Sequence, residues 1–251
     1  MCGIVGYIGF RNASDFLLDG LHRLEYRGYD SAGIAVFHKG EVAVRKRAGR
    51  VCELDRLIET DGVEGTVGIG HTRWATHGET TDVNSHPHVG GNGEVVLVHN
   101  GVVENHNSLR TQLQTLGYVF RTTTDTEVIA HLIAHHLEKR IETDGEICTH
   151  EACVEVVETA MRKIEGTYGV AVLFRDCPDL IVAARAGSPL VVGIGRGEYF
   201  VASDAGPLVG YTEEVVYLAD HEIVALTSES IDLLHRDAGK KSPSIQVLDQ
   251  V

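Results

Sequence analysis

A cysteine stands directly after the initiator methionine, where it could serve as a nucleophile. Cys2 is followed by Gly3, and removal of Met1 would place a free α-amine beside the Cys2 thiol. A free α-amine has a pKa of about 7.7–8.0, so it can accept a proton near neutral pH. An N-terminal nucleophile served by its own amine is one form of nucleophilic catalysis. Position alone leaves open the alternative that Cys2 is a small buried residue that begins the first strand.

Four further segments are dense in polar residues and glycine near the ends of expected strands. Each also has an ordinary structural explanation. Asn100 and Gly101 could form the type I′ turn of a plain hairpin, Arg73 could be a surface charge, and Trp74 could be a core aromatic. The four segments are residues 27–33, 71–78, 85–88 and 99–101.

Histidines are numerous, but their spacing does not indicate a metal site. His77, His86 and His88 lie close in the sequence, yet no carboxylate stands at a supporting spacing. His131 and His135 are four residues apart on an expected helix, and we expect both to lie on its solvated side, away from its apolar stripe. The sequence therefore predicts no metal.

The cysteines other than Cys2 point to a reducing compartment. The chain has five cysteines and no C-x-x-C pair, which fits neither a disulfide framework nor a cysteine-rich zinc site. Such cysteines are usually small buried hydrophobes. Cys148 and Cys153 flank a polar segment, and we expect no specific role for them.

Short apolar strands and a few helices are expected to position these residues. Helical spacing of apolar residues predicts helices at 13–24, with Ser14 as a candidate N-cap, at 108–116, at 127–139 after Asp125 or Thr126, and at 151–164. Strands and helices occur in segregated blocks, which is typical of an α+β fold with mainly antiparallel sheets. The predicted strands are 4–8, 33–37, 67–71, 95–99, 169–174, 180–184, 190–194, 199–202, 215–218 and 222–226.

Size and charge exclude several classes of protein. The 251 residues carry a formal net charge of −14, which disfavours nucleic acid and anionic membrane surfaces as partners. No run approaches the roughly 18 apolar residues of a membrane span, and no basic segment precedes the first apolar stretch as in a signal peptide. We therefore expect a soluble cytoplasmic protein, with one domain at 1–234 and a polar tail at 235–251 that begins a linker.

Taken together, seven segments resemble the class II glutamine amidotransferases, whose nucleophile is an N-terminal cysteine. They occur in the expected order between Cys2 and about Leu226, which is far more specific than one short motif. They are most similar to the glutaminase half of the glutamine–fructose-6-phosphate aminotransferases. The segments are CGIVGYIG, LEYRGYDSAG, GIGHTRWATHG, NSHPH, VHNGVVENH, TDTEVIAHL and EGTYGVAVL.

This resemblance implies a fold and a set of catalytic roles. The fold is a four-layer αββα sandwich of the N-terminal-nucleophile type, with two mainly antiparallel sheets between helical layers. Cys2 would attack the side-chain amide of glutamine to give a γ-glutamyl thioester and ammonia, and water would then release glutamate. The Asn100 amide and the Gly101 backbone N–H would stabilise the oxyanion.

Substrate recognition follows from the same resemblance. Glutamine is a zwitterion, so Arg73 would bind its α-carboxylate in bidentate fashion and Asp125 its α-ammonium. Arg27 would orient the N-terminus, and His86 would support the loop that closes over the substrate. That loop would comprise Trp74, Thr76, His77 and Gly78.

The resemblance implies partners as well, but no cofactor. The ammonia would serve the synthesis of glucosamine 6-phosphate from fructose 6-phosphate on a C-terminal sugar-phosphate isomerase domain, in a full-length protein that forms a homodimer. Two alternatives remain. The first is a different cysteine-type N-terminal-nucleophile hydrolase or an amidotransferase of purine or asparagine synthesis, and the second is a non-catalytic domain that keeps the fold. Segments 27–33 and 72–78 favour the amino-sugar enzyme over the first, and an intact Cys2, Asn100 and Arg73 argue against the second.

Overall fold

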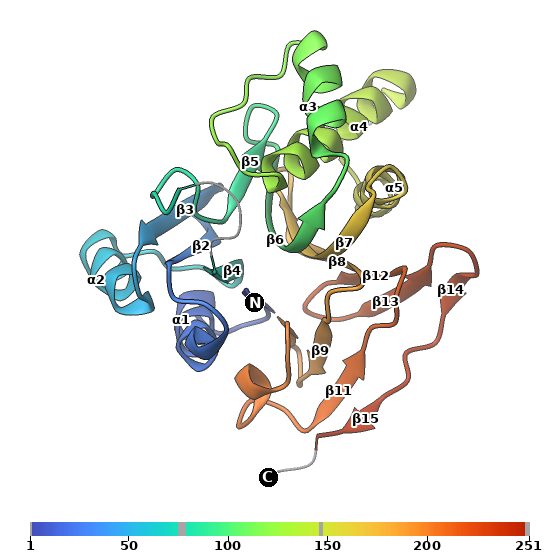
Figure 1. Cartoon of the computed structure of the whole chain (residues 1–251). Helices are drawn as coiled ribbons and strands as arrows, with labels where there is room; N and C mark the ends of the chain where they lie inside the picture. The colour runs from blue at the N-terminus through green and yellow to red at the C-terminus, as the bar shows by residue number, and fades with distance from the viewer. Residues whose placement is uncertain (1, 75–78, 146–147, 249–251) are drawn as a thin grey trace.

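The computed structural model describes residues 2–74, 79–145 and 148–248. The N-terminal strand belongs to an antiparallel sheet of eight strands, which is the first of two sheets (Figure 1). The strand order of this first sheet is β15-β11-β9-β10-β1-β4-β2-β3, so the N-terminal strand β1 lies in the middle. The strands are β1 (Gly3–Ile8), β2 (Ser31–His38), β3 (Glu41–Ala48), β4 (Val67–Arg73), β9 (Val191–Ile194), β10 (Tyr199–Ala202), β11 (Glu214–Tyr217) and β15 (Gln246–Val247).

A second sheet of seven antiparallel strands stacks on the first. Its order is β14-β13-β12-β8-β7-β6-β5. The strands are β5 (His88–Gly90), β6 (Val95–Val103), β7 (Gly166–Phe174), β8 (Cys177–Ala186), β12 (Glu222–Leu226), β13 (Ile231–His235) and β14 (Gly239–Lys241).

Helices cover the outer face of each sheet (Figure 1). Two pack on the first sheet and three on the second, and single 3₁₀ turns at Glu25–Arg27 and Gly206–Leu208 join neighbouring elements. The helices are α1 (Ala13–Arg23), α2 (Val51–Asp61), α3 (His106–Thr115), α4 (Thr126–Asp144) and α5 (His150–Met161).

The alternation of side chains along the central strands builds these layers. Successive strand residues point to opposite faces, so in β1 Ile4 joins the core between the two sheets while Val5 and Tyr7 pack under the helices. Val98 of the second sheet lies in the same inter-sheet core. Apolar residues on both faces of both sheets produce the four-layer αββα sandwich, which confirms the predicted fold.

Two predicted helix features differ in the structure. Helix α1 begins at Ala13 with Asn12 at its N-cap, so the prediction of Ser14 as the cap is wrong. The Ser14 hydroxyl instead donates to the carbonyl of Val63 at 2.6 Å. The prediction that His131 is solvated is also wrong, because His131 is buried against β5 and its Nδ1 accepts the Gly91 N–H at 3.1 Å.

The structure contains elements that the sequence pattern did not predict. Strand β3 forms the edge of the first sheet and carries Arg45, Lys46 and Arg47 in succession, and such charge is typical of edge strands that must not pair further. Helix α2 follows it and ends at Gly62, which has a left-handed conformation with φ of 63°.

The segment expected to begin a linker also carries secondary structure. Strand β14 pairs with β13 in the second sheet, and β15 pairs with β11 at the edge of the first sheet. Residues up to Leu248 are therefore attached to the sandwich. Among the helices of the described residues, none combines the length and the apolar character that a membrane crossing requires.

Candidate active site

Cys2 lies at the start of the central strand β1, where three neighbours fix its position. Its carbonyl accepts the Asn100 amide at 3.1 Å and the Arg27 Nε–H at 3.2 Å. The register that pairs Gly3 with Thr72 brings Trp74 beside it, and the Trp74 N–H lies 3.3 Å from the Cys2 Sγ. The nucleophile predicted from the sequence is thus held between the two sheets.

The surroundings of Cys2 act on its thiol in opposite directions. Burial raises the pKa of the Cys2 thiol, whereas the Trp74 N–H and the positive charges of Arg73 and Arg27 lower it, and the pKa remains above its ordinary value. The thiol therefore stays protonated near neutral pH and needs a base before it can attack.

Asn100 comes from β6 of the second sheet and faces Cys2 across the junction of the sheets. Its Nδ2 donates to the Cys2 carbonyl, and its Oδ1 lies 3.0 Å from the His71 Nε2. The same His71 nitrogen lies 3.1 Å from the carbonyl of His99. Both neighbours are acceptors, so His71 Nε2 carries the proton and fixes which way the Asn100 amide points.

Gly101 follows Asn100 at a place where only glycine fits. Its φ is +133°, and a Cβ on this residue would lie 2.1 Å from the Thr167 carbonyl oxygen of the neighbouring strand β7. Any side chain would push β6 away from β7. The Asn-Gly pair therefore lies inside a strand, and the hairpin-turn explanation of this dipeptide is wrong.

Arg73 interacts with both the Cys2 thiol and the opposite charge of Asp125. Burial lowers the pKa of the Arg73 guanidinium, and the Cys2 thiol and the carboxylates of Asp125 and Asp30 oppose that shift. Arg73 is 5% exposed at the end of β4, and its Nη1 donates to the Glu79 carbonyl at 3.4 Å. A cation and an anion close enough to interact fit a zwitterionic ligand.

Asp125 is held by the start of α4. Its Oδ2 accepts the Val103 N–H at 2.9 Å. Two residues on, Glu127 accepts the backbone N–H groups of Arg121 and Thr122 at 2.8 Å each. Burial opposes ionisation of Glu127, but its hydrogen bonds prevail and lower its pKa to about 2. The segment that carries Asp125 is therefore tied down on both sides.

The remaining predicted residues occupy different surroundings. Trp74 is 43% exposed and packs edge-on against Tyr29 at 5.5 Å between ring centroids. Arg27 also pairs with Asp204 at 2.8 Å. His86 lies behind Asn100, where its ring stacks on His71 at 3.9 Å. The other predicted loop residues, Thr76, His77 and Gly78, lie outside the described residues, as does Met1.

The sequence matches a known family over the segment that holds most of these residues. The glutamine amidotransferase domain family matches residues 71–209, which contain Arg73, Asn100, Gly101 and Asp125. The chain belongs to this family.

Curated relatives of this glutamine amidotransferase domain extend over nearly its whole length. The glutamine–fructose-6-phosphate aminotransferase of Caldanaerobacter subterraneus is 49% identical over 243 residues, and one from Thermus thermophilus is 48% identical over 233 residues. These alignments cover 96% and 93% of this chain but only 38% and 36% of the relatives. The chain thus spans little more than a third of the length of the relatives it matches.

A solved structure shares the fold. The glutamine phosphoribosylpyrophosphate amidotransferase of Bacillus subtilis superposes with a TM-score of 0.75 at 26% identity, over 94% of this chain and 49% of that one. This likeness agrees with the αββα sandwich of the amidotransferase domain.

Sequence reasoning missed the histidines that support the site. Burial lowers the pKa of His71 to about 3 and also lowers that of His99. His99 Nδ1 lies 2.9 Å from the Thr126 hydroxyl, which links β6 to α4. The sequence did contain a signal, since His71 stands two residues before Arg73 and His99 directly before Asn100. Only the packing of the sheets and of α4, however, shows that His71 contacts Asn100 and His99 contacts Thr126.

Proposed function

We propose that this chain hydrolyses glutamine to glutamate and ammonia, with Cys2 as the nucleophile. The observation that carries the proposal is the meeting of Cys2, at the start of the first sheet, with the Asn100 amide from the second sheet at 3.1 Å. A nucleophile beside a fixed hydrogen-bond donor is the minimum that acyl transfer requires.

The α-amine of Cys2 is the base in this proposal. After removal of Met1, the amine takes the thiol proton as the sulfur attacks the amide carbon, and the proton passes to the leaving nitrogen, which departs as ammonia. Water then attacks the γ-glutamyl thioester, which releases glutamate and restores the thiol. His71 is a poor alternative base, because its pKa is about 3 and its Nε2 already donates to Asn100.

Asn100 and Gly101 stabilise the oxyanion that forms during attack. The Asn100 Nδ2 carries two hydrogens, of which one donates to the Cys2 carbonyl. In this proposal the other donates to the oxyanion. His71 holds the amide in this orientation, so no reorganisation is needed when the charge appears. Loss of one such donor raises the barrier by about 2.7–4 kcal/mol.

The opposite charges of Arg73 and Asp125 select the free amino acid. Arg73 binds the α-carboxylate and Asp125 the α-ammonium, which leaves the side-chain amide directed at Cys2. Arg27 holds the N-terminal strand through the Cys2 carbonyl. Trp74 contacts the substrate in this proposal, and His86 acts on the site indirectly through His71, on which its ring stacks.

We further propose that the ammonia serves amino-sugar synthesis in a longer cytoplasmic protein. The relatives at 48–49% identity are glutamine–fructose-6-phosphate aminotransferases, whereas the glutamine phosphoribosylpyrophosphate amidotransferase is 26% identical. On this proposal, residues 1–234 are the glutaminase domain, and residues 235–251, whose strands β14 and β15 still pair with its sheets, lead to a sugar-phosphate isomerase domain. That domain converts fructose 6-phosphate to glucosamine 6-phosphate in a homodimer.

The test is a glutaminase assay on protein whose N-terminus is shown by intact mass to be Cys2. Glutamine should yield glutamate, and Cys2→Ala should abolish the yield while the far-UV circular dichroism spectrum stays the same. The matched control is Cys52→Ala, which removes an exposed cysteine on α2. No glutamate from correctly processed protein would contradict the proposal.

A further inference from the structure

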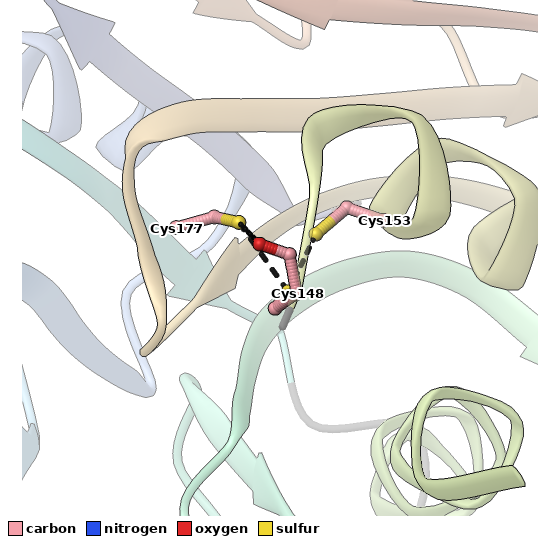
Figure 2. A group of neighbouring side chains, drawn as sticks. All are labelled: Cys148, Cys153 and Cys177. Atoms are coloured by element: carbon pink, nitrogen blue, oxygen red, sulfur yellow. Dashed lines mark hydrogen bonds between the residues drawn. The ribbon is translucent and has the colours of Figure 1, made fainter. Parts of the chain in front are cut away.

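Three buried cysteines from separate parts of the chain meet on the outer side of the second sheet (Figure 2). Cys148 precedes the N-cap of α5, Cys153 lies in the first turns of α5, and Cys177 begins β8. The Cys148 Sγ lies 3.1 Å from that of Cys153 and 3.3 Å from that of Cys177. All three sulfur atoms lie within 4.8 Å of one another, and their side chains point to a common centre.

Simple apolar packing does not require this arrangement. A cysteine that acts as a small hydrophobe packs its sulfur against carbon atoms, and the surrounding core of Val156, Val157 and Leu180 offers many. Here each sulfur instead has another sulfur as a close neighbour. A disulfide would join two of the three, with bonded sulfur atoms about 2.05 Å apart, and would leave the third unused.

We propose that Cys148, Cys153 and Cys177 together bind one thiophilic d¹⁰ cation, Zn²⁺ or Cu⁺. Thiolates are the ligands that these ions prefer. With a metal–sulfur distance of about 2.3 Å, two thiolates on one ion lie about 3.8–4.0 Å apart. The two close sulfur pairs therefore need to separate by less than about 1 Å, which rotation of the side chains can supply.

The position at the start of α5 favours anionic ligands. The N-terminal end of a helix carries a partial positive charge, and a thiolate near it is stabilised. Each thiol loses its proton to solvent as it binds, so uptake of the ion releases protons and weakens at low pH. The positive ion offsets part of the charge of the three thiolates, which could not remain buried alone.

The bound ion would add a link between two elements that already share the contact of His150 with Asp179 at 2.9 Å. Cys177 follows the tight turn between β7 and β8, and its Sγ also donates to the Cys148 carbonyl at 3.1 Å. An ion on all three sulfurs would fasten the start of α5 to that turn. Because an ion that binds only the folded state stabilises it, the thermal midpoint should rise when the site is filled.

The experiment titrates the folded chain with Zn²⁺ and, separately, with Cu⁺ under anaerobic conditions. Cys2→Ala is the parent protein, so the nucleophile cannot bind the ion. Metal content is measured by mass spectrometry after gel filtration, together with the thermal midpoint. We expect one of the two ions to stay bound in equimolar amount and to raise the midpoint. Cys153→Ala in this parent should weaken binding by more than about tenfold, whereas Cys52→Ala should not alter it.

Three results would overturn the proposal. The first is that neither ion is retained by the folded parent protein. The second is that Cys153→Ala and Cys177→Ala each bind the ion as tightly as the parent. The third is a disulfide between two of the three cysteines in freshly prepared protein, seen by peptide mass spectrometry without reduction. The parent protein alone decides the first and third, so they hold even where a variant fails to fold.

Discussion

Replacement of Asn100 by alanine should lower the kcat for glutamine hydrolysis strongly and the stability of the fold only slightly. The side chain makes two hydrogen bonds, to the Cys2 carbonyl at 3.1 Å and from His71 Nε2 at 3.0 Å. If its amide also stabilises the oxyanion, its loss raises the barrier by about 2.7–4 kcal/mol, which is a fall in kcat of about 100- to 1,000-fold. The KM for glutamine should change by less than about threefold, because Asn100 acts mainly once the charge has formed.

The cost of Asn100→Ala to stability should be small. The Cys2 carbonyl keeps the Arg27 Nε–H at 3.2 Å, and His71 Nε2 keeps the His99 carbonyl at 3.1 Å. Neither partner is left without a hydrogen bond, so we expect a loss of about 1–2 kcal/mol in the free energy of unfolding. Urea denaturation measures that loss, and glutamate release by protein that starts at Cys2 measures kcat and KM.

Asn105→Ala is the matched control for Asn100→Ala. Asn105 also makes two hydrogen bonds, to the Lys163 carbonyl at 2.8 Å and from the Glu165 N–H at 3.2 Å. It should lose similar stability and keep its kcat. A kcat of Asn100→Ala within about tenfold of the parent, or an equal fall in Asn105→Ala, would refute the oxyanion role.

Three further predictions concern Arg73, the N-terminus and His71. Arg73→Ala should raise the KM for glutamine at least about tenfold with a smaller effect on kcat, because its contact with the α-carboxylate is the same in ground and transition states; steady-state kinetics would show the reverse split if the role is misassigned. Protein that retains Met1 should not release glutamate, because a peptide nitrogen cannot take the Cys2 proton; full activity at the unprocessed mass would exclude the α-amine as base. The free energy of unfolding should fall as pH drops from about 6.5 towards 3, because the unfolded chain protonates His71 in this range while the folded protein, with a His71 pKa of about 3, does not. Measured by urea denaturation, this free energy should depend less steeply on pH in His71→Gln than in the parent. An unchanged slope in that variant would count against the contribution of His71.

The local sequence pattern was sufficient to predict strands that are apolar and that have turn residues at both ends. Strands β10 (Tyr199–Ala202) and β12 (Glu222–Leu226) have the predicted bounds, because their side chains are buried among apolar neighbours and turn residues flank them. Strand β3 and the short strands β14 and β15 escaped prediction. Each lies at or near a sheet edge, where charged and polar residues are tolerated and the apolar signal is weak.

The residues proposed to carry the chemistry could be named from the sequence because they stand in short, ordered motifs. Cys2, Asn100 and Arg73 each belong to a segment whose local spacing is distinctive. Their mutual distances were not available from that spacing. Asn100 meets Cys2 only because the strand that begins at Gly3 and the strand that contains Asn100 belong to different sheets that stack on each other.

The sequence by itself determined the nucleophile candidate, the family and the α+β class, since these depend on residue types, their order and their periodicity along the chain. Only the tertiary structure decided that His71 orients Asn100, that His131 is buried, and that Cys177 joins Cys148 and Cys153. The first and last of these facts depend on pairings between residues 29 positions apart, and the second on which face of a helix meets a sheet. Burial and hydrogen bonding act between the groups that the packed layers bring together, whatever their separation along the chain. That separation therefore does not predict which groups will meet.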